Sequence, residues 1–378
     1  MQDKQPQECI YRQADVYFNN ILAAIQMAQS QIDMEVYIFE LDIIGKQVSQ
    51  ALIQAAKRGI KVRLLVDGMG VGFDFVTIAK QLQSAGAQVR IHRPLPWHFK
   101  QWSFSLAAVK GMQKFWYLLS YINKRNHRKL IIIDQKSVFL GSFNISQKHL
   151  SSIQGGENWR DTAIKLDKIN TRAIQSAFEF SWNKRKFTAI KHLVQTVLNS
   201  PFRFNFTRHL RQAQHKQLLL KIAQAKKQIW ITNAYFVPDA KLLSTLMTAS
   251  YRGVDVRIVL PYRSDVFFIP WAASFFYEKL LVSGARIYEY QSGMLHAKTL
   301  IIDDWASIGS SNFNRRSLNH DLEVDYSLQL NDSINQLEHD FLDDIKQSEE
   351  LCQYELNTKK PWQRYLGGLI LFLFSYWL

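Results

Sequence analysis

The sequence is poor in cysteine and has no apolar stretch long enough to cross a bilayer. Its two cysteines, Cys9 and Cys352, lie near opposite ends of the 378 residues. Two cysteines cannot form the framework of a disulfide-stapled secreted domain, so we expect free thiols, with one disulfide between them as the alternative. Residues 1–6 are polar and contain no apolar core of a signal peptide. We therefore expect the protein to act in the cytoplasm or on the cytoplasmic side of a membrane.

Acidic residues are missing from two long stretches. None occurs between Asp74 and Asp134, where there are ten Lys or Arg, and none between Glu179 and Asp239, where there are eleven. The whole chain has 47 Lys and Arg against 32 Asp and Glu, which gives a formal net charge of +15. This excess favours an anionic partner, either a nucleic acid or an anionic lipid surface. Two solvated basic faces are the alternative, but aromatic residues in both stretches favour contact with an anionic surface.

The chain contains one pattern of helices and strands that occurs twice. The first half predicts helices at about 14–30, 42–58 and 73–84 and strands at 33–39, 61–66 and 88–92. The second half predicts the same order, with helices at about 210–227 and 238–252 and strands at 228–233, 254–259 and 286–290. Alternating strands and helices are typical of an α/β fold. We therefore expect two similar lobes, each with a mixed, largely parallel sheet flanked by helices.

Each half also carries the motif H-x-K-x4-D followed by G-S-x-N. The two sets of candidate catalytic residues are His127, Lys129 and Asp134 in the first half, and His296, Lys298 and Asp303 in the second. The asparagines of the G-S-x-N segments are Asn144 and Asn312. Two copies, each at the same place in a repeated unit, make a chance origin a poor explanation.

The residue types in this motif suit phosphoryl chemistry. Side chains two residues apart on a strand point to the same face, so each motif offers an imidazole together with an ammonium group. The aspartate faces the other side, where we expect it to hold the structure, and the asparagine can present an amide N–H. Two such sets would surround a tetrahedral anion. One histidine can attack phosphorus while the other donates a proton to the leaving oxygen. No metal is required, and the sequence contains no convincing cluster of metal ligands.

These paired motifs resemble those of the phospholipase D superfamily, and residues of about 10–350 are similar to its bacterial cardiolipin synthases. Three further segments carry the resemblance: Asp67-Gly68, Trp159-Arg160-Asp161 and Asn314-Arg315-Arg316-Ser317. The resemblance implies two phospholipase D-type lobes related by a pseudo-twofold axis, with the active site at their interface. It also implies a covalent phosphatidyl-histidine intermediate.

The resemblance further implies roles for single residues. His127 would be the nucleophile and His296 the general acid and base, although these two roles can be exchanged. The phosphate-binding residues would be Lys129, Asn144, Lys298 and Asn312. Asp161 and Glu323 would orient the histidines through the second ring nitrogen, with Glu157 as the alternative to Asp161. The loop after Asp303 is one residue shorter than the loop after Asp134.

The parts of the chain are expected as follows: a first lobe at 1–185 with a membrane-facing insertion at about 93–123, a basic connector at 186–209, a second lobe at 210–350 and a tail at 351–378. The insertion mixes aromatic residues with lysines, which suits membrane headgroups. A helical hairpin that caps the core is the alternative. The tail ends in 13 apolar residues, about 20 Å as a helix, too short for a bilayer core of about 30 Å. We expect it to lie on the membrane or to enter it partway, with a buried C-terminal helix as the alternative.

The expected function is that of a phosphatidyltransferase, which passes a phosphatidyl group from phosphatidylglycerol or another phospholipid to phosphatidylglycerol. Hydrolysis of phosphodiesters by a phospholipase D or a nuclease is one alternative, and a non-catalytic lipid-binding scaffold is another. The insertion and the tail favour lipid, so no nucleic acid partner is expected, and the two intact motifs disfavour a scaffold. We expect no cofactor, an anionic phospholipid substrate, and a peripheral or monotopic location on the cytoplasmic side of the inner membrane.

Overall fold

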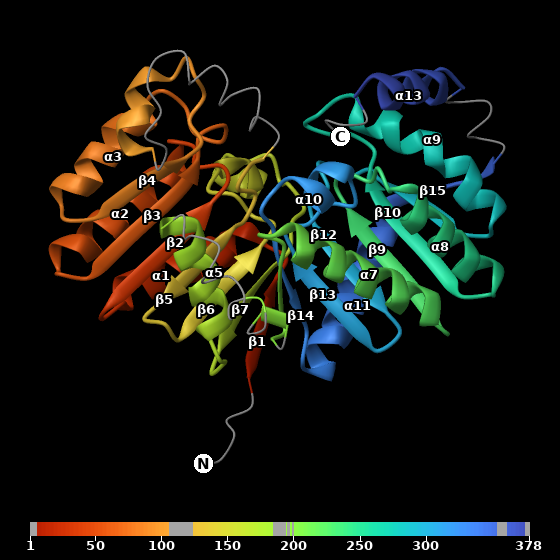
Figure 1. Cartoon of the computed structure of the whole chain (residues 1–378), viewed down its shortest axis with the longest axis horizontal. Helices are drawn as coiled ribbons and strands as arrows, with labels where there is room; N and C mark the ends of the chain where they lie inside the picture. The colour runs from red at the N-terminus through yellow and green to blue at the C-terminus, as the bar shows by residue number, and fades with distance from the viewer. Residues whose placement is uncertain are drawn as a thin grey trace.

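The computed structural model describes residues 6–105, 124–183, 194, 197–198, 200–353 and 361–374 of the chain. Two mixed sheets lie side by side, with the ends of their central strands facing each other and helices covering their outer faces (Figure 1). Each sheet belongs to one half of the sequence. The two expected α/β lobes are therefore confirmed.

The first lobe is a seven-stranded sheet in the order β1-β7-β6-β5-β2-β3-β4. Its strands are β1 (Gln7–Tyr11), β2 (Gln31–Val36), β3 (Lys61–Asp67), β4 (Gln88–His92), β5 (Leu130–Ile133), β6 (Ser137–Gly141) and β7 (Ala163–Asp167). Its helices are α1 (Ala14–Met27), α2 (Ile43–Lys57), α3 (Phe75–Ser84) and α5 (Arg172–Asn183), with short 3-10 turns η1 (Phe99–Phe104), η2 (Gln147–His149) and η3 (Ser152–Gln154).

The second lobe repeats this order as β8-β14-β13-β12-β9-β10-β11, with β15 added at the far edge. Its strands are β8 (Phe202–Phe204), β9 (Gln228–Asn233), β10 (Asp255–Pro261), β11 (Arg286–Tyr290), β12 (Lys298–Ile302), β13 (Trp305–Gly309), β14 (Val324–Ser327) and β15 (Ser348–Leu351). Its helices are α7 (Arg208–Gln224), α8 (Ala240–Tyr251), α9 (Ile269–Val282), α10 (Arg315–Asn319), α11 (Asn331–Lys346) and α13 (Pro361–Phe374).

The expectation of largely parallel sheets is wrong. Among the strands that the structure describes, β2-β3-β4 and β9-β10-β11 pair in parallel, and the other pairs of both sheets are antiparallel. The reason lies in the connections. Helices α2, α3, α8 and α9 carry the chain back over the sheet between parallel strands, whereas β5 and β6, and likewise β12 and β13, are joined by hairpins too short for anything but antiparallel pairing.

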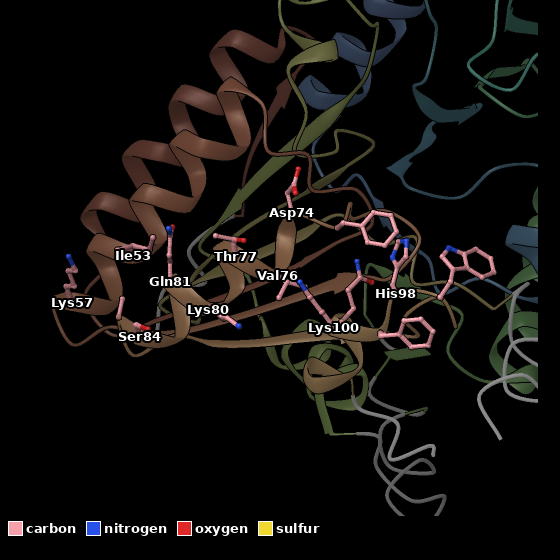
Figure 2. Close-up of a pocket in the computed structure, with 15 residues that line it drawn as sticks. Ile53, Lys57, Asp74, Val76, Thr77, Lys80, Gln81, Ser84, His98 and Lys100 are labelled. Atoms are coloured by element: carbon pink, nitrogen blue, oxygen red, sulfur yellow. The ribbon is translucent and has the colours of Figure 1, made fainter. Parts of the chain in front are cut away.

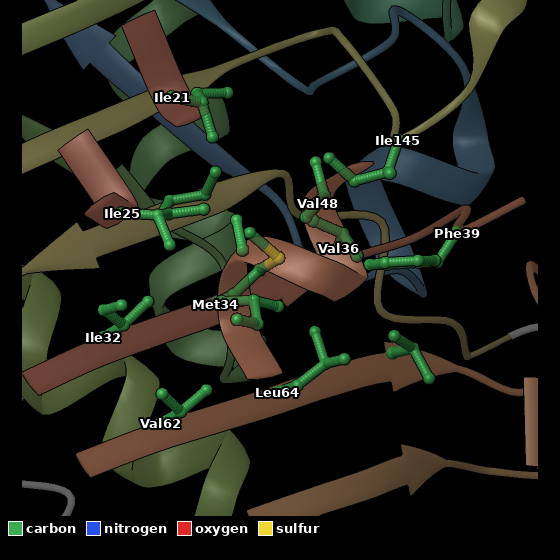
Figure 3. Close-up of a cluster of buried hydrophobic side chains, with 14 of the residues drawn as sticks. Ile21, Ile25, Ile32, Met34, Val36, Phe39, Val48, Val62, Leu64 and Ile145 are labelled. Atoms are coloured by element: carbon green, nitrogen blue, oxygen red, sulfur yellow. The ribbon is translucent and has the colours of Figure 1, made fainter. Parts of the chain in front are cut away.

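Each lobe has a core between its sheet and its outer helices, and the two lobes share a third core. In the first lobe, Ile21 and Ile25 of α1 pack on Met34 of β2 and Leu64 of β3 (Figure 3). Successive residues of a strand face opposite sides of the sheet, so the uninterrupted apolar strand β5 serves both cores. Ile131 and Ile133 face the helices, while Leu130 and Ile132 join the shared core with side chains of the second lobe such as Tyr288 and Ile308.

The predicted boundaries need one correction. Phe202–Phe204, inside the predicted connector at 186–209, form β8 and pair with β14, so the second lobe begins before residue 210. Of the predicted insertion at 93–123, residues 106–123 lie outside the described part, and so do residues 354–360 and 375–378 of the tail. Cys9 and Cys352 are not joined by a disulfide, as expected. Within the described ranges, none of the helices combines the length and the apolar character that crossing a membrane requires.

Candidate active site

The aspartates of the two motifs lie outside the site. Asp134 follows β5 with a φ of 51°, and its carboxylate accepts the backbone N–H groups of Gln29, Ser30 and Gln31 at 2.7–3.2 Å. Asp303 repeats this arrangement with the N–H groups of residues 226–228. Although burial alone would raise the pKa of Asp134, these hydrogen bonds lower it. Neither aspartate lines the cavity that holds the histidines. Each instead fixes the turn that ends the motif strand to the start of the neighbouring strand.

The two histidines, by contrast, share a cavity of about 260 Å³ between the lobes. His127 precedes β5 and His296 precedes β12, so both enter the cavity from the starts of equivalent strands. Asn144 and Asn312 line the same cavity. The structure thus brings together four of the residues that the motifs pointed to, two from each half of the chain.

Each histidine is anchored through its backbone by the opposite lobe. The N–H of His127 donates to the carbonyl oxygen of Leu322 at 2.9 Å, and the N–H of His296 donates to that of Arg160 at 2.8 Å. The Arg160 guanidinium in turn binds the Asp344 carboxylate of α11 at 2.8 and 2.9 Å, deep in the interface. Relative movement of the lobes would displace both imidazoles, so the interface sets their geometry.

The carboxylates that contact the histidines also come from the opposite lobe. Glu323 of the second lobe lies 3.1 Å from Nδ1 of His127, and Asp161 of the first lobe lies 2.9 Å from Nδ1 of His296. Both carboxylates are fully buried. Glu157 is exposed and accepts instead from the indole of Trp159 at 2.9 Å, so Asp161 is the residue of this pair that reaches a histidine. With Nδ1 held in this way, Nε2 is left as the reactive nitrogen of each ring.

The two lysines lie close behind the histidines. Lys129 Nζ donates to the carbonyl oxygen of His127 at 2.7 Å, and Lys298 Nζ donates to that of His296. Burial, and then the charge of Lys298, lower the pKa of Lys129 to about 7, and burial lowers the pKa of Lys298 to about 8. Binding of an anion beside the two lysines would offset the cost of burying their charges, so the pair favours an anionic ligand.

The lysine charges also act on the imidazoles. Burial, followed by the charges of Lys129 and Lys298, lowers the pKa of His127 well below its usual range. Burial and Lys298 lower the pKa of His296 to about 4, against the opposing effect of Asp161. The pKa of Asp161 would be raised by burial but is held well below its usual range by its histidine neighbours. His127 is therefore a neutral imidazole at neutral pH, the form that can attack an electrophile.

Several residues of the cavity were missed by reasoning from the sequence. Tyr37 and Tyr235 follow β2 and β9 at nearly equivalent places, and their rings contact His127 and His296. Aligning the two halves residue by residue after these strands could have revealed them. Trp159 and buried His149 also lie beside His296. Trp159 stands in a segment that carries the family resemblance, but that segment assigned it no role. His149 lies five residues after Asn144, where the second half has Ser317 after Asn312, so comparing the two halves at this position could have drawn attention to it.

A larger cavity, of about 1020 Å³, lies on the outer side of the first lobe and is not part of this site. Side chains of α3, among them Thr77 and Lys80, line it together with His98 and Lys100 (Figure 2). None of the motif residues contributes to it. Among the residues that the structure describes, no three histidine, cysteine, aspartate or glutamate side chains gather closely enough to hold a metal ion.

Two solved structures are similar to this chain in fold. A phosphatidylserine synthase of Haemophilus influenzae Rd KW20 matches 98% of this chain and 94% of its own, with a TM-score of 0.69 and 13% identity. A polyphosphate kinase of Porphyromonas gingivalis matches 97% of this chain and 55% of its own, with a TM-score of 0.59 and 11% identity. At these identities, the likeness is one of fold.

Sequence comparison is more specific. The family described as "Cardiolipin synthase, PLD-like domain" matches residues 21–182 and 218–345, one segment in each lobe. A cardiolipin synthase of Clostridium perfringens (strain SM101) is 34% identical over 352 residues, which are 89% of this chain and 70% of that protein. A cardiolipin synthase of Geobacillus kaustophilus is 30% identical over 369 residues, or 94% of this chain and 69% of that protein. The chain therefore belongs to the cardiolipin synthase family of the phospholipase D superfamily.

Proposed function

We propose that this protein is a phosphatidyltransferase that makes cardiolipin from phosphatidylglycerol, with a phosphatidyl group carried on a histidine. The observation that carries the proposal is the crossed pair of His–carboxylate contacts around one cavity with two buried lysines behind it. This arrangement offers two imidazoles with free Nε2 atoms and a positive potential between them. A phosphodiester needs one nucleophile, one proton donor and charge neutralisation, and the site contains all three.

In the first step, Nε2 of His127 attacks the phosphorus of the donor lipid. The bond between phosphorus and the glycerol headgroup oxygen breaks, and His296 donates its Nε2 proton to that oxygen. The anionic phosphodiester beside His296 raises the pKa of this imidazole from its low value, so substrate binding itself charges the acid. Asp161 then stabilises the imidazolium through Nδ1, as Glu323 does for the positive charge that develops on His127.

In the second step, His296 is neutral and acts as the base. It removes the proton from a free hydroxyl of a second phosphatidylglycerol, whose oxygen attacks phosphorus and displaces His127. Lys129 and Lys298, with amide groups of Asn144 and Asn312, neutralise and position the nonbridging oxygens in both steps. The result is one cardiolipin and one glycerol, with both histidines restored.

The cavity wall favours a lipid acceptor over water. Val266, Phe268 and Ile269 form an apolar side of the cavity beside Tyr235. Apolar walls exclude water from a reactive phosphohistidine and favour an acceptor that carries acyl chains. Hydrolysis would require water beside the phosphohistidine, so a phospholipase D activity is expected to be the minor reaction.

The proposed site of action is the membrane surface, on the cytoplasmic side. Two features support it: the excess of positive charge, which attracts anionic headgroups, and the apolar helix α13, which carries exposed side chains on one face. Such a helix suits a peripheral or monotopic protein. The tail would then contribute to membrane binding together with the basic surface.

The test is product analysis after incubation with vesicles of defined phospholipids. The unchanged protein should convert phosphatidylglycerol to cardiolipin and glycerol, and adding phosphatidylethanolamine identifies a second donor if ethanolamine is released. His127→Ala and His296→Ala should each abolish cardiolipin formation, while His209→Ala, a change of an exposed histidine in α7, should not. Cardiolipin formation that survives either active-site change would disprove the two-histidine mechanism, and phosphatidic acid as the main product would favour a phospholipase.

A further inference from the structure

Helix α13 docks on α9 through glycines and turns a large apolar face outward. The two helices lie side by side (Figure 1). A Cβ atom on Gly367 would come within 2.0 Å of the Trp271 carbonyl oxygen, so only glycine permits this approach. On the other side of α13, Leu366, Leu369 and Phe372 are 41%, 53% and 83% exposed. Residues three apart lie on one face of a helix, so these side chains form a continuous stripe.

The exposed apolar surface continues onto α9 and the loop before it. Phe275 of α9 lies against Gly368 and is itself exposed, and Phe267 is 70% exposed while its ring contacts Trp271. Lys279 Nζ lies 5.9 Å from the centre of the Phe275 ring, which places a cation at the border of this surface. We call this surface the α9–α13 platform, and it consists of Phe267, Phe275, Leu366, Leu369 and Phe372.

Partly buried apolar side chains lie between the platform and the active-site cavity. Ile370 and Leu371 of α13 belong to one packed group with Val266, Phe268 and Ile269, of which Ile269 is buried. These last three residues also line the cavity that holds the histidines. Apolar side chains in contact with one another therefore extend from the cavity to α13.

We propose that the platform holds the acyl chains of the phospholipid whose phosphate lies between the two histidines. This inference rests on the proposed function, because a diacyl phospholipid must keep its chains out of water while its headgroup reacts. The connected apolar side chains offer the acyl chains a route from the cavity, and exposed aromatic and aliphatic side chains bordered by a cation match the boundary between acyl chains and headgroups. The same surface lets the protein take lipid directly from the bilayer.

The experiment compares two substrates in the double variant Leu369→Ser/Phe372→Ser. Conversion of dioleoyl-phosphatidylglycerol in vesicles should fall at least about tenfold, because two apolar contacts with lipid are lost, whereas conversion of monomeric dibutyryl-phosphatidylglycerol should stay within about twofold of the parent value. The matched control is Leu220→Ser/Leu342→Ser, which changes exposed leucines of α7 and α11 and should alter neither rate. Unchanged conversion of vesicles, or an equal loss with both substrates, would overturn the proposal.

Failure of the proposed function would look different. The unchanged protein would then convert neither substrate. Sedimentation with phosphatidylglycerol vesicles tests the platform even in that case, because the double variant should bind the vesicles less tightly than the control pair. Equal vesicle binding by the double variant and the control pair would overturn the proposal about the platform, whether or not the protein is active.

A second, independent observation concerns the residue five positions after each motif asparagine. In the second lobe this is Ser317, whose Oγ accepts the backbone N–H of Asn312 at 3.2 Å and donates to the Glu323 carboxylate at 2.6 Å. The serine thus connects the backbone of a phosphate-site residue to the carboxylate that holds His127. The second lobe therefore links two parts of the site through a single side chain.

In the first lobe the same position is occupied by His149. Its Nε2 accepts the backbone N–H of Asn144 at 3.2 Å, and its Nδ1 lies 2.7 Å from Asp161, the carboxylate that holds His296. We infer that His149 is a positioning residue for His296, the counterpart of Ser317 in a different chemical form. It acts through Asp161 and does not touch the substrate.

The test of His149 uses a pair of variants that differ in polarity. His149→Gln retains a donor and an acceptor and should keep at least about half of kcat, whereas His149→Phe retains the bulk only and should lose about tenfold or more in kcat with little change in KM. Thermal unfolding of both variants monitors the fold. Equal kcat in the two variants, or a loss confined to KM, would overturn the role, and inactivity of the unchanged protein would refute the proposed function instead.

Discussion

The two buried lysines lead to a prediction about proton uptake, with pH as the perturbation. Burial lowers the pKa of Lys129 to about 7 and that of Lys298 to about 8. A divalent anion bound between the motifs favours the charged form of each lysine, so both pKa values rise toward the usual value of about 10.4. Binding must then take up protons wherever the lysines are partly neutral. The affinity for the anion therefore falls as the pH rises through 7 and 8.

Sulfate is a suitable probe because its own charge does not change in this range. At pH 8 a lysine of pKa 7 is about nine-tenths neutral and one of pKa 8 about half neutral, so sulfate binding should take up about 1.4 protons. The same pKa values predict that sulfate binds about tenfold more weakly at pH 8 than at pH 7. At pH 6 both lysines are almost fully charged, and their contribution to proton uptake falls to about 0.1 proton.

Isothermal titration calorimetry in buffers of different ionisation enthalpy measures this uptake directly. Lys129→Gln should reduce the uptake at pH 8 to about half a proton or less, since only Lys298 remains to be charged. Lys61→Gln, a change of an exposed lysine of β3, should leave it unaltered. Proton release on binding, or an affinity that does not depend on pH between 7 and 8, would refute the assignment of these lysines to the anion site.

Two further predictions concern the carboxylates. Asp134→Ala should lower the free energy of unfolding by about 1 kcal/mol or more through the loss of hydrogen bonds to the backbone, with kcat within about twofold of the parent value. A stable but inactive variant in denaturation and turnover assays would return the aspartate to the catalytic residues. Glu323→Gln should lower kcat about 100-fold while the protein still folds, because His127 loses the charge that stabilises its imidazolium. A kcat close to the parent value would show that the contact between Glu323 and His127 does not matter to catalysis.

The residues around the phosphate could be predicted from the sequence because their spacing is local. His127 and Lys129 lie two residues apart at the start of β5, and His296 and Lys298 do so at β12, so an argument about strand geometry applies to both. The opposite orientation of Asp134 follows from the same geometry, since it lies five positions, an odd number, after Lys129. The structural role expected for its position agrees with its contacts at Gln29–Gln31.

The contacts that depend on how the two lobes pack against each other could not be predicted. Which carboxylate reaches which histidine is decided by the interface, where the backbone of Leu322 holds His127 and that of Arg160 holds His296. Likewise, the antiparallel halves of the sheets are built from hairpins. The β-α-β pattern does not specify which strand of the sheet each hairpin pairs with. The short edge strands β1, β8 and β15 carry too few residues for a periodic signal.

The crossed carboxylates also bear on how such a chain could have arisen. A protein of half this length, with one motif and one carboxylate, would contain no complete His–carboxylate pair of its own. Two copies related by a twofold axis would complete each other, because each would lend its carboxylate to the histidine of its neighbour. Fusion of two such genes would preserve both crossed contacts, and each half could then change independently. The equivalent positions of His149 and Ser317 carry different residues, which is the kind of change expected. The present chain thus shows, inside a single polypeptide, the reciprocal contacts that such a dimer would make.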